Sequence, residues 1–301
     1  MRVLVSGASG LIGSALMPAL AAEGHAAGRL VRKETGQPGP GDVAWDVGTG
    51  WIDAAALGSW DAVVSLAGFS VASRRWTDTV KKQIRGSRVD GARLLARALA
   101  ASARPPRVLV QASAVGYYGD RGDEILAETS RPGRGFLAET CVAWEQAAAP
   151  AAARGVRVVF LRFGVVLSAR GGALAKLLPP FRLGLAGRIG SGRQYMPWLA
   201  LDDAVAIVRH ALATDALSGP VNAVAPEQVT NAEFTRALAR VLRRPAILPL
   251  PAFAARLAFG QMADEALLAS QRVAPERLAA GGFHFRHPDL EPALRSILSL
   301  P

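Results

Sequence analysis

The chain has 301 residues, of which 50% are hydrophobic and 20% charged, with one cysteine and a formal net charge of +11. This composition supplies a packed core and excludes a mainly disordered chain, and a single cysteine excludes a fold built on disulfides. Charged residues interrupt every apolar run before the ~20 residues that a membrane helix needs, and MRVLVSGASG lacks a signal-peptide core. We therefore expect a cytoplasmic protein with no membrane partner.

The first half of the chain alternates short β-branched segments with longer Ala- and Leu-rich ones. Strands are predicted at residues 2–6, 26–32, 42–46, 61–68, 107–113 and 156–164. Helices are predicted at residues 11–22, 78–102 and 136–153. Continuous apolar strands separated by helices are typical of a parallel sheet that is buried on both faces, which is the doubly wound α/β class.

After about residue 170 the pattern becomes irregular, because glycine and proline gather between residues 171 and 197. A helix capped by Asp202 or Asp203 is predicted to run to Ala213, and a strand is predicted at 220–225. Thr230 and Glu233 match a capping box that opens a helix to Arg243. The last fifty residues carry two or three short helices, and no repeat or linker separates them from the rest.

A glycine-rich turn, Gly7-Ala8-Ser9-Gly10-Leu11-Ile12-Gly13, follows the first strand and opens the first helix. Gly7 allows the tight turn, Gly10 lets a pyrophosphate approach the backbone, and Gly13 lets the helix pack against the strand. The N–H groups of the helix N-terminus face the phosphate charge. We expect a dinucleotide to contact Gly7, Ser9, Gly10, Leu11, Ile12 and Gly13. The alternative is a glycine turn without a ligand.

The end of the second strand distinguishes NAD from NADP. An acidic residue there would bind the 2′-hydroxyl of the adenosine ribose, but this chain has Arg32 followed by Lys33. Two cations favour a 2′-phosphate, which a guanidinium can bind through two hydrogen bonds. NADP(H) is therefore the predicted cofactor. Glu34 could still serve NAD, and a solvated strand end is the alternative for both cations.

The charge of the whole chain fits this reading. Only four of the 35 basic residues are lysines, and the arginines are dispersed rather than interleaved with aromatic residues in a stripe. Nucleic-acid binding would rest on charge alone. A phosphorylated small molecule makes better use of the charge, so we expect no nucleic-acid partner.

Several motifs together resemble the extended short-chain dehydrogenase/reductases, the nucleotide-sugar epimerase/dehydratase family. They are GASGLIG, LAG at 66–68, YYG at 117–119 and RFGVVL at 162–167. An atypical epimerase-like subgroup with a C-terminal region of unknown function is similar in RRW (74–76), GSR (86–88), the WE pair (144–145), the segment 171–198, DDAV (202–205) and SQRVAPERLAAGGFHF (270–285).

The resemblance implies two parts. An NADP-binding Rossmann domain would span 1–170, with segments at about 195–225 returning to it. A smaller C-terminal substrate lobe would span 171–301 and include a C-terminal domain at about 248–297. The resemblance also implies that Leu66, Ala67 and Gly68 pass under the adenosine side of the cofactor, that Arg88 contacts the cofactor, and that Val165 meets the nicotinamide carboxamide. For Arg88 a helix-surface cation is the alternative.

The family's acid/base pair is missing. Its pattern is a tyrosine four residues before a lysine, whose ammonium lowers the pKa of the phenol, and no Y-x-x-x-K exists in this chain. Judged by the WE pair, Leu137 and Cys141 occupy the two positions. Ser113, at the end of the fifth strand, and Tyr117 or Tyr118, on the loop that follows, are the candidate catalytic residues. The alternative for each tyrosine is an aromatic wall.

The segment GSGRQYMPW (190–198) is a candidate wall of the substrate pocket. Arg193 and Gln194 offer donors to a polar ligand, and Trp198 offers an apolar face. The alternative is a packed loop whose polar groups bind backbone. The histidines have no metal-ligand spacing, so no metal is expected, and Cys141 is interpreted as a core residue rather than a nucleophile.

Three functions remain from the sequence. The first is an NADP(H)-binding epimerase/reductase-like oxidoreductase, a monomer or homodimer, that acts on a polar small-molecule substrate such as a nucleotide sugar. The second is a non-catalytic protein that senses NADPH and has lost the Tyr-Lys pair. Nucleic-acid binding is the third, on charge alone.

Overall fold

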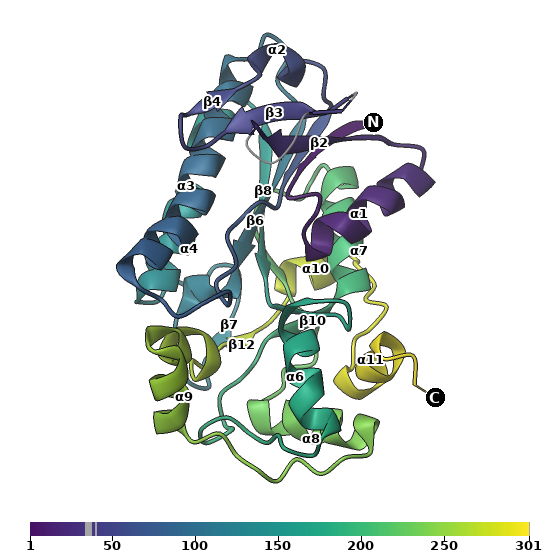
Figure 1. Ribbon diagram of the computed structural model, residues 1–301. Helices are drawn as coiled ribbons and strands as arrows, with labels where there is room; N and C mark the ends of the chain where they lie inside the picture. The colour runs from purple at the N-terminus through teal and green to yellow at the C-terminus, as the bar shows by residue number, and fades with distance from the viewer. Residues whose placement is uncertain (34–37, 40, 301) are drawn as a thin grey trace.

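The computed structural model describes residues 1–33, 38–39 and 41–300. A large sheet with helices on both faces forms one part of the molecule, and a smaller group of helices and short strands adjoins one end of that sheet (Figure 1). Glu34, which could have indicated NAD, lies outside the described residues.

Eight strands form the main sheet in the order β11-β8-β6-β5-β1-β2-β3-β4. They are β1 (Arg2–Ser6), β2 (Ala26–Arg32), β3 (Val43–Asp46), β4 (Trp51–Ile52), β5 (Ala62–Ser65), β6 (Val108–Ala114), β8 (Arg157–Phe163) and β11 (Gly219–Ala223). All neighbours pair in parallel except β3 and β4. The chain moves outward from β1 through β2 and β3 and returns to β5 on the other side of β1. Ligands bind at the carboxyl ends of the strands at such a reversal.

Helices cover both faces of this sheet (Figure 1). On one face lie α1 (Leu11–Ala22) and α7 (Leu201–Ala213), and on the other lie α3 (Asp78–Ala101), α4 (Phe136–Gln146) and α5 (Ala149–Ala153), with the short α2 (Ala54–Leu57) near the β4 edge. Val3 and Val5 pack in one hydrophobic cluster with Leu16, whereas Leu4 packs in another with Leu95. Because successive side chains of a strand point to opposite faces, this packing explains the continuous apolar strands. The doubly wound α/β prediction is confirmed.

The helix predicted over 136–153 is two helices, α4 and α5. Pro150 lies in the first turn of α5. A proline has no backbone N–H and its ring clashes with the carbonyl four residues earlier, so it is tolerated at the start of a helix but not in its interior. The short antiparallel β3–β4 edge and the helix α6 (Gly172–Arg182) were not predicted either.

Asp202 and Asp203 do not cap α7, which corrects the sequence prediction. The N-cap residue is Ala200, so both aspartates lie in the first turn of the helix. The buried carboxylate of Asp203 instead accepts hydrogen bonds from the backbone N–H groups of Arg286 at 2.7 Å and His287 at 2.9 Å. Asp203 could have capped the helix by residue type, but in the structure its carboxylate binds the distant segment around residue 286.

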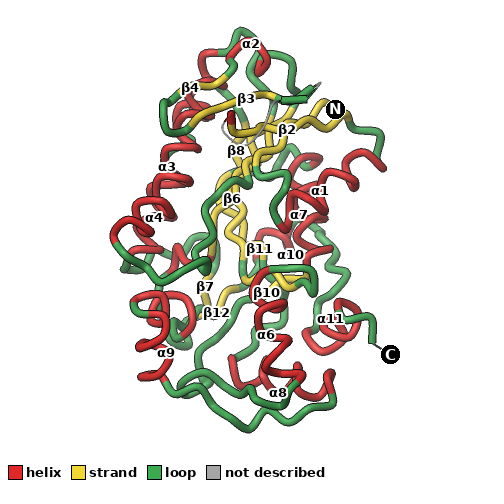
Figure 2. Tube along the Cα trace, in the orientation of Figure 1, coloured by secondary structure: helices red, strands yellow, loops and turns green. Residues whose placement is uncertain are grey.

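The smaller lobe lies at the end of the molecule opposite β3 and β4 (Figure 2). It contains α6, α8 (Asn231–Leu242), α9 (Ala252–Phe259), the π-turn η3 (Ala263–Leu267) and α11 (Leu290–Ile297). Two small parallel sheets and two short helices connect the lobe to the main sheet. One sheet pairs β9 (Val165–Leu167) with β10 (Trp198–Ala200), and the other pairs β7 (Ile125–Leu126) with β12 (Arg272–Val273). The helices are η2 (Val115–Tyr118) and α10 (Glu276–Ala280).

The lobe has a hydrophobic cluster of its own, in which Trp198 and Phe234 are the largest fully buried side chains. The predicted capping box begins α8. The Thr230 hydroxyl accepts from the Glu233 N–H, and the Glu233 carboxylate accepts from the Thr230 N–H at 2.8 Å.

Candidate functional site

The glycine turn lies at the carboxyl end of β1, where the direction of the sheet reverses. Gly7 has a φ of +69°, which favours glycine, and a Cβ there would lie 2.8 Å from the carbonyl carbon of Leu66. At Gly13 a Cβ would lie 2.2 Å from the Gly7 oxygen. Gly10 is exposed, so its missing side chain leaves the backbone open to a ligand. The tight turn at Gly7 and the close packing at Gly13 therefore require glycine, as the motif predicts, and the approach of a pyrophosphate to Gly10 stays a prediction.

The N-terminus of α1 is free to bind an anion. Gly10 is its N-cap residue, no side chain caps it, and its first turn holds no acidic residue. The uncapped N–H groups and the helix dipole favour a negative charge here. Ser9 is exposed beside them, and Leu11 and Ile12 are half-buried.

Arg32 and Lys33 are exposed where β2 ends, next to β1 in the sheet. Because β1 and β2 are parallel, with Ser6 opposite Leu30, the two cations and the glycine turn lie at the same edge. The Lys33 ammonium also lies 5.2 Å from the ring centroid of Trp51. The predicted 2′-phosphate contacts and the predicted pyrophosphate contacts are therefore neighbours in the fold.

Leu66, Ala67 and Gly68 follow β5 and pass beside the glycine turn. The N–H groups of Leu66 and Ala67 both donate to the Ser6 hydroxyl, at 3.1 and 3.2 Å. This serine therefore connects the end of β1 to the loop after β5. Ser6 is fully buried, so its hydroxyl fixes this loop against β1.

Arg88 is a half-buried cation on α3 that points toward this loop. Its guanidinium donates to the carbonyl oxygens of Phe69 at 2.8 Å and Ile84 at 3.1 Å and stacks over the ring of Trp144. A Cβ on Gly68 would lie 3.3 Å from the guanidinium carbon. Burial lowers the pKa of Arg88, and no carboxylate of the described chain forms an ion pair with it. An unpaired, partly desolvated cation at a crevice favours an anionic ligand.

Val165 begins β9 and donates its N–H to the Pro197 oxygen at 2.8 Å. Its side chain is half-buried. The chain continues to α6, whose first residue, Gly172, lies beside Leu11: a Cβ on Gly172 would be 3.1 Å from that side chain. The start of α6 thus adjoins the start of α1, and the contact of Val165 with the nicotinamide carboxamide stays a prediction.

Ser113 is a buried residue at the carboxyl end of β6 and forms part of a polar network. Its hydroxyl donates to the Glu145 carboxylate at 2.7 Å. Arg162, opposite Ser113 on β8, donates to both carboxylate oxygens of Glu145 at 2.8 Å. The side chain of Arg162 is 3% exposed and that of Glu145 12% exposed. Burial by itself lowers the pKa of Arg162, but the hydrogen bonds to Glu145 raise it above its ordinary value.

Tyr117 and Tyr118 have different environments. Tyr118 is fully buried, and its hydroxyl donates toward Asn222 at 2.7 Å and accepts from Arg162 at 3.0 Å. Burial raises the pKa of Tyr118. Tyr117 is half-buried, with the Arg162 guanidinium 3.5 Å from its ring centroid, and its hydroxyl has no hydrogen-bond partner in the described part of the chain. Tyr117 is therefore the tyrosine whose hydroxyl is available to a ligand.

The two helix positions of the missing dyad carry no proton donor of ordinary strength. Leu137 is apolar and Cys141 is buried, and burial raises the pKa of that thiol to about 12. Both pack against Gly116, where a Cβ would lie 3.3 Å from Leu137 and 3.9 Å from the Cys141 sulfur. This helix face therefore packs against the loop after β6.

The three residues predicted to bind substrate lie in different environments. Arg193 is exposed. Gln194 is 8% exposed, and its amide nitrogen donates to the oxygens of Ile189 at 3.0 Å and Leu267 at 3.1 Å. Trp198 has no exposed surface and donates to the Glu227 oxygen. Gln194 and Trp198 thus match the packed-loop alternative, because their polar groups bind backbone and their surfaces are covered.

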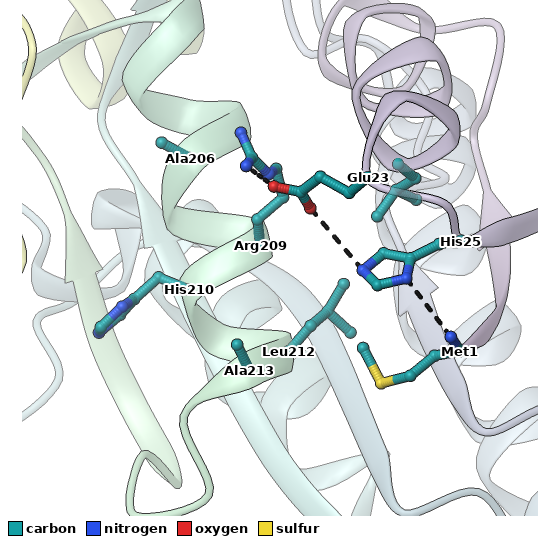
Figure 3. Close-up of a pocket in the computed structure, with 9 residues that line it drawn as sticks. Met1, Glu23, His25, Ala206, Arg209, His210, Leu212 and Ala213 are labelled. Atoms are coloured by element: carbon teal, nitrogen blue, oxygen red, sulfur yellow. Dashed lines mark hydrogen bonds and ion pairs between the residues drawn. The ribbon is translucent and has the colours of Figure 1, made fainter.

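A cavity of about 260 Å³ lies between α1 and α7, away from the glycine turn. It adjoins Met1 and His25, at the amino ends of β1 and β2. Figure 3 shows Glu23 between Arg209 of α7 and His25, which in turn contacts the N-terminal ammonium. These contacts tie the end of α1 to α7.

The described residues, 1–33, 38–39 and 41–300, contain no helix that is both long and apolar enough to cross a membrane. Nor do their His, Cys, Asp and Glu side chains form any group of three or more that could hold a metal ion.

Glu145 and Arg162 were not among the predicted site residues. Two signals in the sequence could have found them. Arg162 interrupts VRVVFLRFG, a strand predicted to be buried on both faces, and a buried guanidinium needs an acidic or carbonyl partner. Glu145 is part of the WE pair that the sequence already singles out.

Comparisons with known proteins agree with this arrangement. Residues 3–224 match the NAD dependent epimerase/dehydratase family, and residues 250–297 match a domain of unknown function (DUF1731). An epimerase family protein of Mycobacterium bovis is 46% identical over 97% of this chain and 96% of its own length. The human epimerase family protein SDR39U1 is 40% identical over 99% of this chain and all of its own length. A crystal structure of human SDR39U1 (isoform 2) with NADPH superimposes with a TM-score of 0.90 at 38% identity, covering 99% of each chain.

Proposed function

Since the chain belongs to the NAD-dependent epimerase/dehydratase family, we propose that it binds NADP(H) and uses it to oxidise, reduce or epimerise a polar substrate. One observation carries the proposal. The uncapped N-terminus of α1 and the exposed pair Arg32 and Lys33 lie at the same edge of the sheet. The Arg88 guanidinium, which forms no ion pair in the described part of the chain, lies against Gly68 in the loop beside the glycine turn. A dinucleotide with three phosphate groups carries the negative charge that these cations and the helix N-terminus attract. The NADPH-bound human relative supports the choice of NADP(H).

The nicotinamide supplies hydride transfer when the cofactor is bound. The chain's own residues would bind the cofactor and orient its groups. The glycine turn and α1 hold the pyrophosphate, Arg32 and Lys33 hold the 2′-phosphate, and Val165 orients the carboxamide. Ser113 and Tyr117 lie at the carboxyl end of β6, where they would contact the reacting oxygen of a substrate. The smaller lobe would close over that substrate, with Arg193 among its contacts.

Exchanging Arg32 for aspartate tests the choice of cofactor. The wild-type protein is expected to bind NADPH at least tenfold more tightly than NADH, which is about 1.4 kcal/mol. Arg32→Asp should narrow that ratio, because it removes a donor to the 2′-phosphate and adds a like charge. Calorimetric titration with both cofactors measures the ratio. Arg97→Asp, at an exposed position of α3, is the matched control. Equal affinities of the wild-type protein would contradict the proposed NADP(H) site.

Exchanging Arg88 for methionine tests whether this arginine binds the cofactor or only stabilises the fold. We expect NADPH affinity to fall about tenfold or more, since hydrogen bonds to charged groups contribute roughly 1.5–3 kcal/mol. The free energy of unfolding of the cofactor-free protein should change by less than about 1 kcal/mol, because the variant also removes the desolvation cost of an unpaired cation. Urea unfolding measures the second quantity. Arg85→Met, an exposed position of the same helix, is the control. Unchanged NADPH affinity in Arg88→Met would assign this arginine to the fold alone.

The second function, a protein that senses NADPH without catalysis, is favoured by Leu137 and Cys141 at the dyad positions. A panel of sugar nucleotides, aldehydes, ketones and alcohols distinguishes the two functions. Turnover of NADPH or NADP⁺ with any of them supports the oxidoreductase. Tight NADPH binding with no turnover supports the sensor.

A further inference from the structure

We propose that the Glu145–Arg162 ion pair is the positioning element of this site, and that it makes the site select a substrate hydroxyl over a carbonyl. It does so by holding Ser113 as a hydrogen-bond acceptor and Tyr117 as a donor. The inference rests on the proposed function, since it assigns the substrate class of the same site.

Ser113 is an acceptor because its only proton is already used. A serine hydroxyl has one proton and two lone pairs, and an ionised carboxylate can only accept. The Glu145 carboxylate accepts two bonds of 2.8 Å from Arg162, and in its contact of 2.7 Å with Ser113 the serine hydroxyl is the donor. The lone pairs of Ser113 are what remain for a ligand. A serine hydroxyl that is free to rotate could donate to a carbonyl, but the Ser113 hydroxyl is held by its bond to Glu145.

Tyr117 is the donor because its hydroxyl is unused and its ring is fixed. The Arg162 guanidinium lies 3.5 Å from the ring centroid, a close cation–π contact. Tyr118 packs edge-on against the same ring, with 5.3 Å between the ring centroids. In the described chain no group accepts the proton of the Tyr117 hydroxyl, whereas the hydroxyl of Tyr118 is bonded to Asn222 and Arg162. Arg162 therefore holds Tyr117 through its ring and Ser113 through Glu145.

A hydroxyl satisfies both groups and a carbonyl satisfies one. The oxygen of an alcohol accepts from Tyr117 while its proton goes to a Ser113 lone pair. A carbonyl oxygen accepts from Tyr117 but places its own lone pairs against those of Ser113. One net hydrogen bond is about 0.5–1.5 kcal/mol, so we expect the alcohol to be preferred roughly threefold to tenfold. The preference does not require turnover, so it can be measured as binding.

The test uses matched alcohol and ketone probes with the whole protein, loaded with NADPH for the alcohols and NADP⁺ for the ketones so that no reaction follows. Cyclohexanol with cyclohexanone, and cyclopentanol with cyclopentanone, are titrated by ligand-observed NMR. The wild-type protein should prefer the alcohol of a pair. Ser113→Ala should abolish the preference, because no acceptor remains. The double variant Glu145→Met with Arg162→Met should shift the preference toward the ketone, because the Ser113 proton is then free to point at the ligand.

Arg157→Met is the control. Arg157 is a partly buried arginine at the other end of β8 that donates to the backbone oxygens of Ala211 and Leu217, and its loss should leave the preference unchanged. Equal binding of alcohol and ketone by the wild-type protein, or binding of neither, overturns the inference. So does an unchanged preference in the double variant. Normal NADPH affinity in those samples leaves the proposed function standing, whereas loss of NADPH binding by the wild-type protein overturns the proposed function itself.

Discussion

Replacing Gly13 by alanine is expected to abolish NADPH binding and to lower the free energy of unfolding by roughly 1–3 kcal/mol, the usual cost of an overpacked core. The added Cβ would lie 2.2 Å from the Gly7 oxygen and 2.7 Å from the Ala8 Cα. Both are backbone atoms, so no flexible side chain can move aside. The helix must shift away from β1, and its N–H groups then no longer converge on the pyrophosphate. Urea unfolding and NADPH titration measure the two effects.

Gly58→Ala is the matched control for Gly13→Ala. Gly58 has an ordinary φ of −71°, and a Cβ there would approach nothing closer than 3.6 Å. Its unfolding free energy should change by less than about 0.5 kcal/mol, as at most uncrowded positions, and NADPH affinity should not change. A Gly13→Ala protein that binds NADPH with wild-type affinity would show that close packing of α1 on β1 is not what forms the site.

Replacing Arg162 alone by methionine is expected to lower the free energy of unfolding by about 3–5 kcal/mol. Both partners of the pair are largely buried, at 3% and 12% side-chain exposure. The variant leaves the Glu145 carboxylate in a site of low dielectric constant without its counter-ion. It also removes the donors to the Tyr118 hydroxyl and the Glu128 oxygen. Denaturant unfolding followed by circular dichroism gives the change in free energy.

The double variant Glu145→Met with Arg162→Met should recover most of that loss, because a buried ion pair and an apolar pair of similar volume are often close in stability. Arg240→Met is the surface control. Arg240 also forms two bonds to one carboxylate, that of Glu291, but its side chain is 60% exposed. Its loss should cost less than about 1 kcal/mol. Additive single-variant losses in the double variant would mean that the two side chains do not act as a pair.

Local patterns predicted the first two strands and the helix between them well. The bounds predicted for β1, α1 and β2 coincide with those of the structure. Each of these segments has a continuous apolar or amphipathic pattern, and the glycine turn separates two of them. The capping box of α8 was predicted for the same reason, since Thr230 and Glu233 interact with each other across one helical turn. The prediction over 136–153 was wrong in detail because it gave too little weight to Pro150.

By itself, then, the sequence determined the doubly wound sheet, the glycine turn and the cations at the end of β2, because each depends on residues that are neighbours along the chain. Only the tertiary structure decided which polar side chains are buried and which partners they bind. Ser113, Glu145 and Arg162 come from β6, α4 and β8, and their hydrogen bonds exist only when those elements pack. The same packing buried Trp198 and Gln194 and left the Tyr117 hydroxyl without a hydrogen-bond partner among the described residues. The physical reason is that burial and hydrogen-bond partners are properties of contacts between distant segments, and residue type and spacing do not specify them.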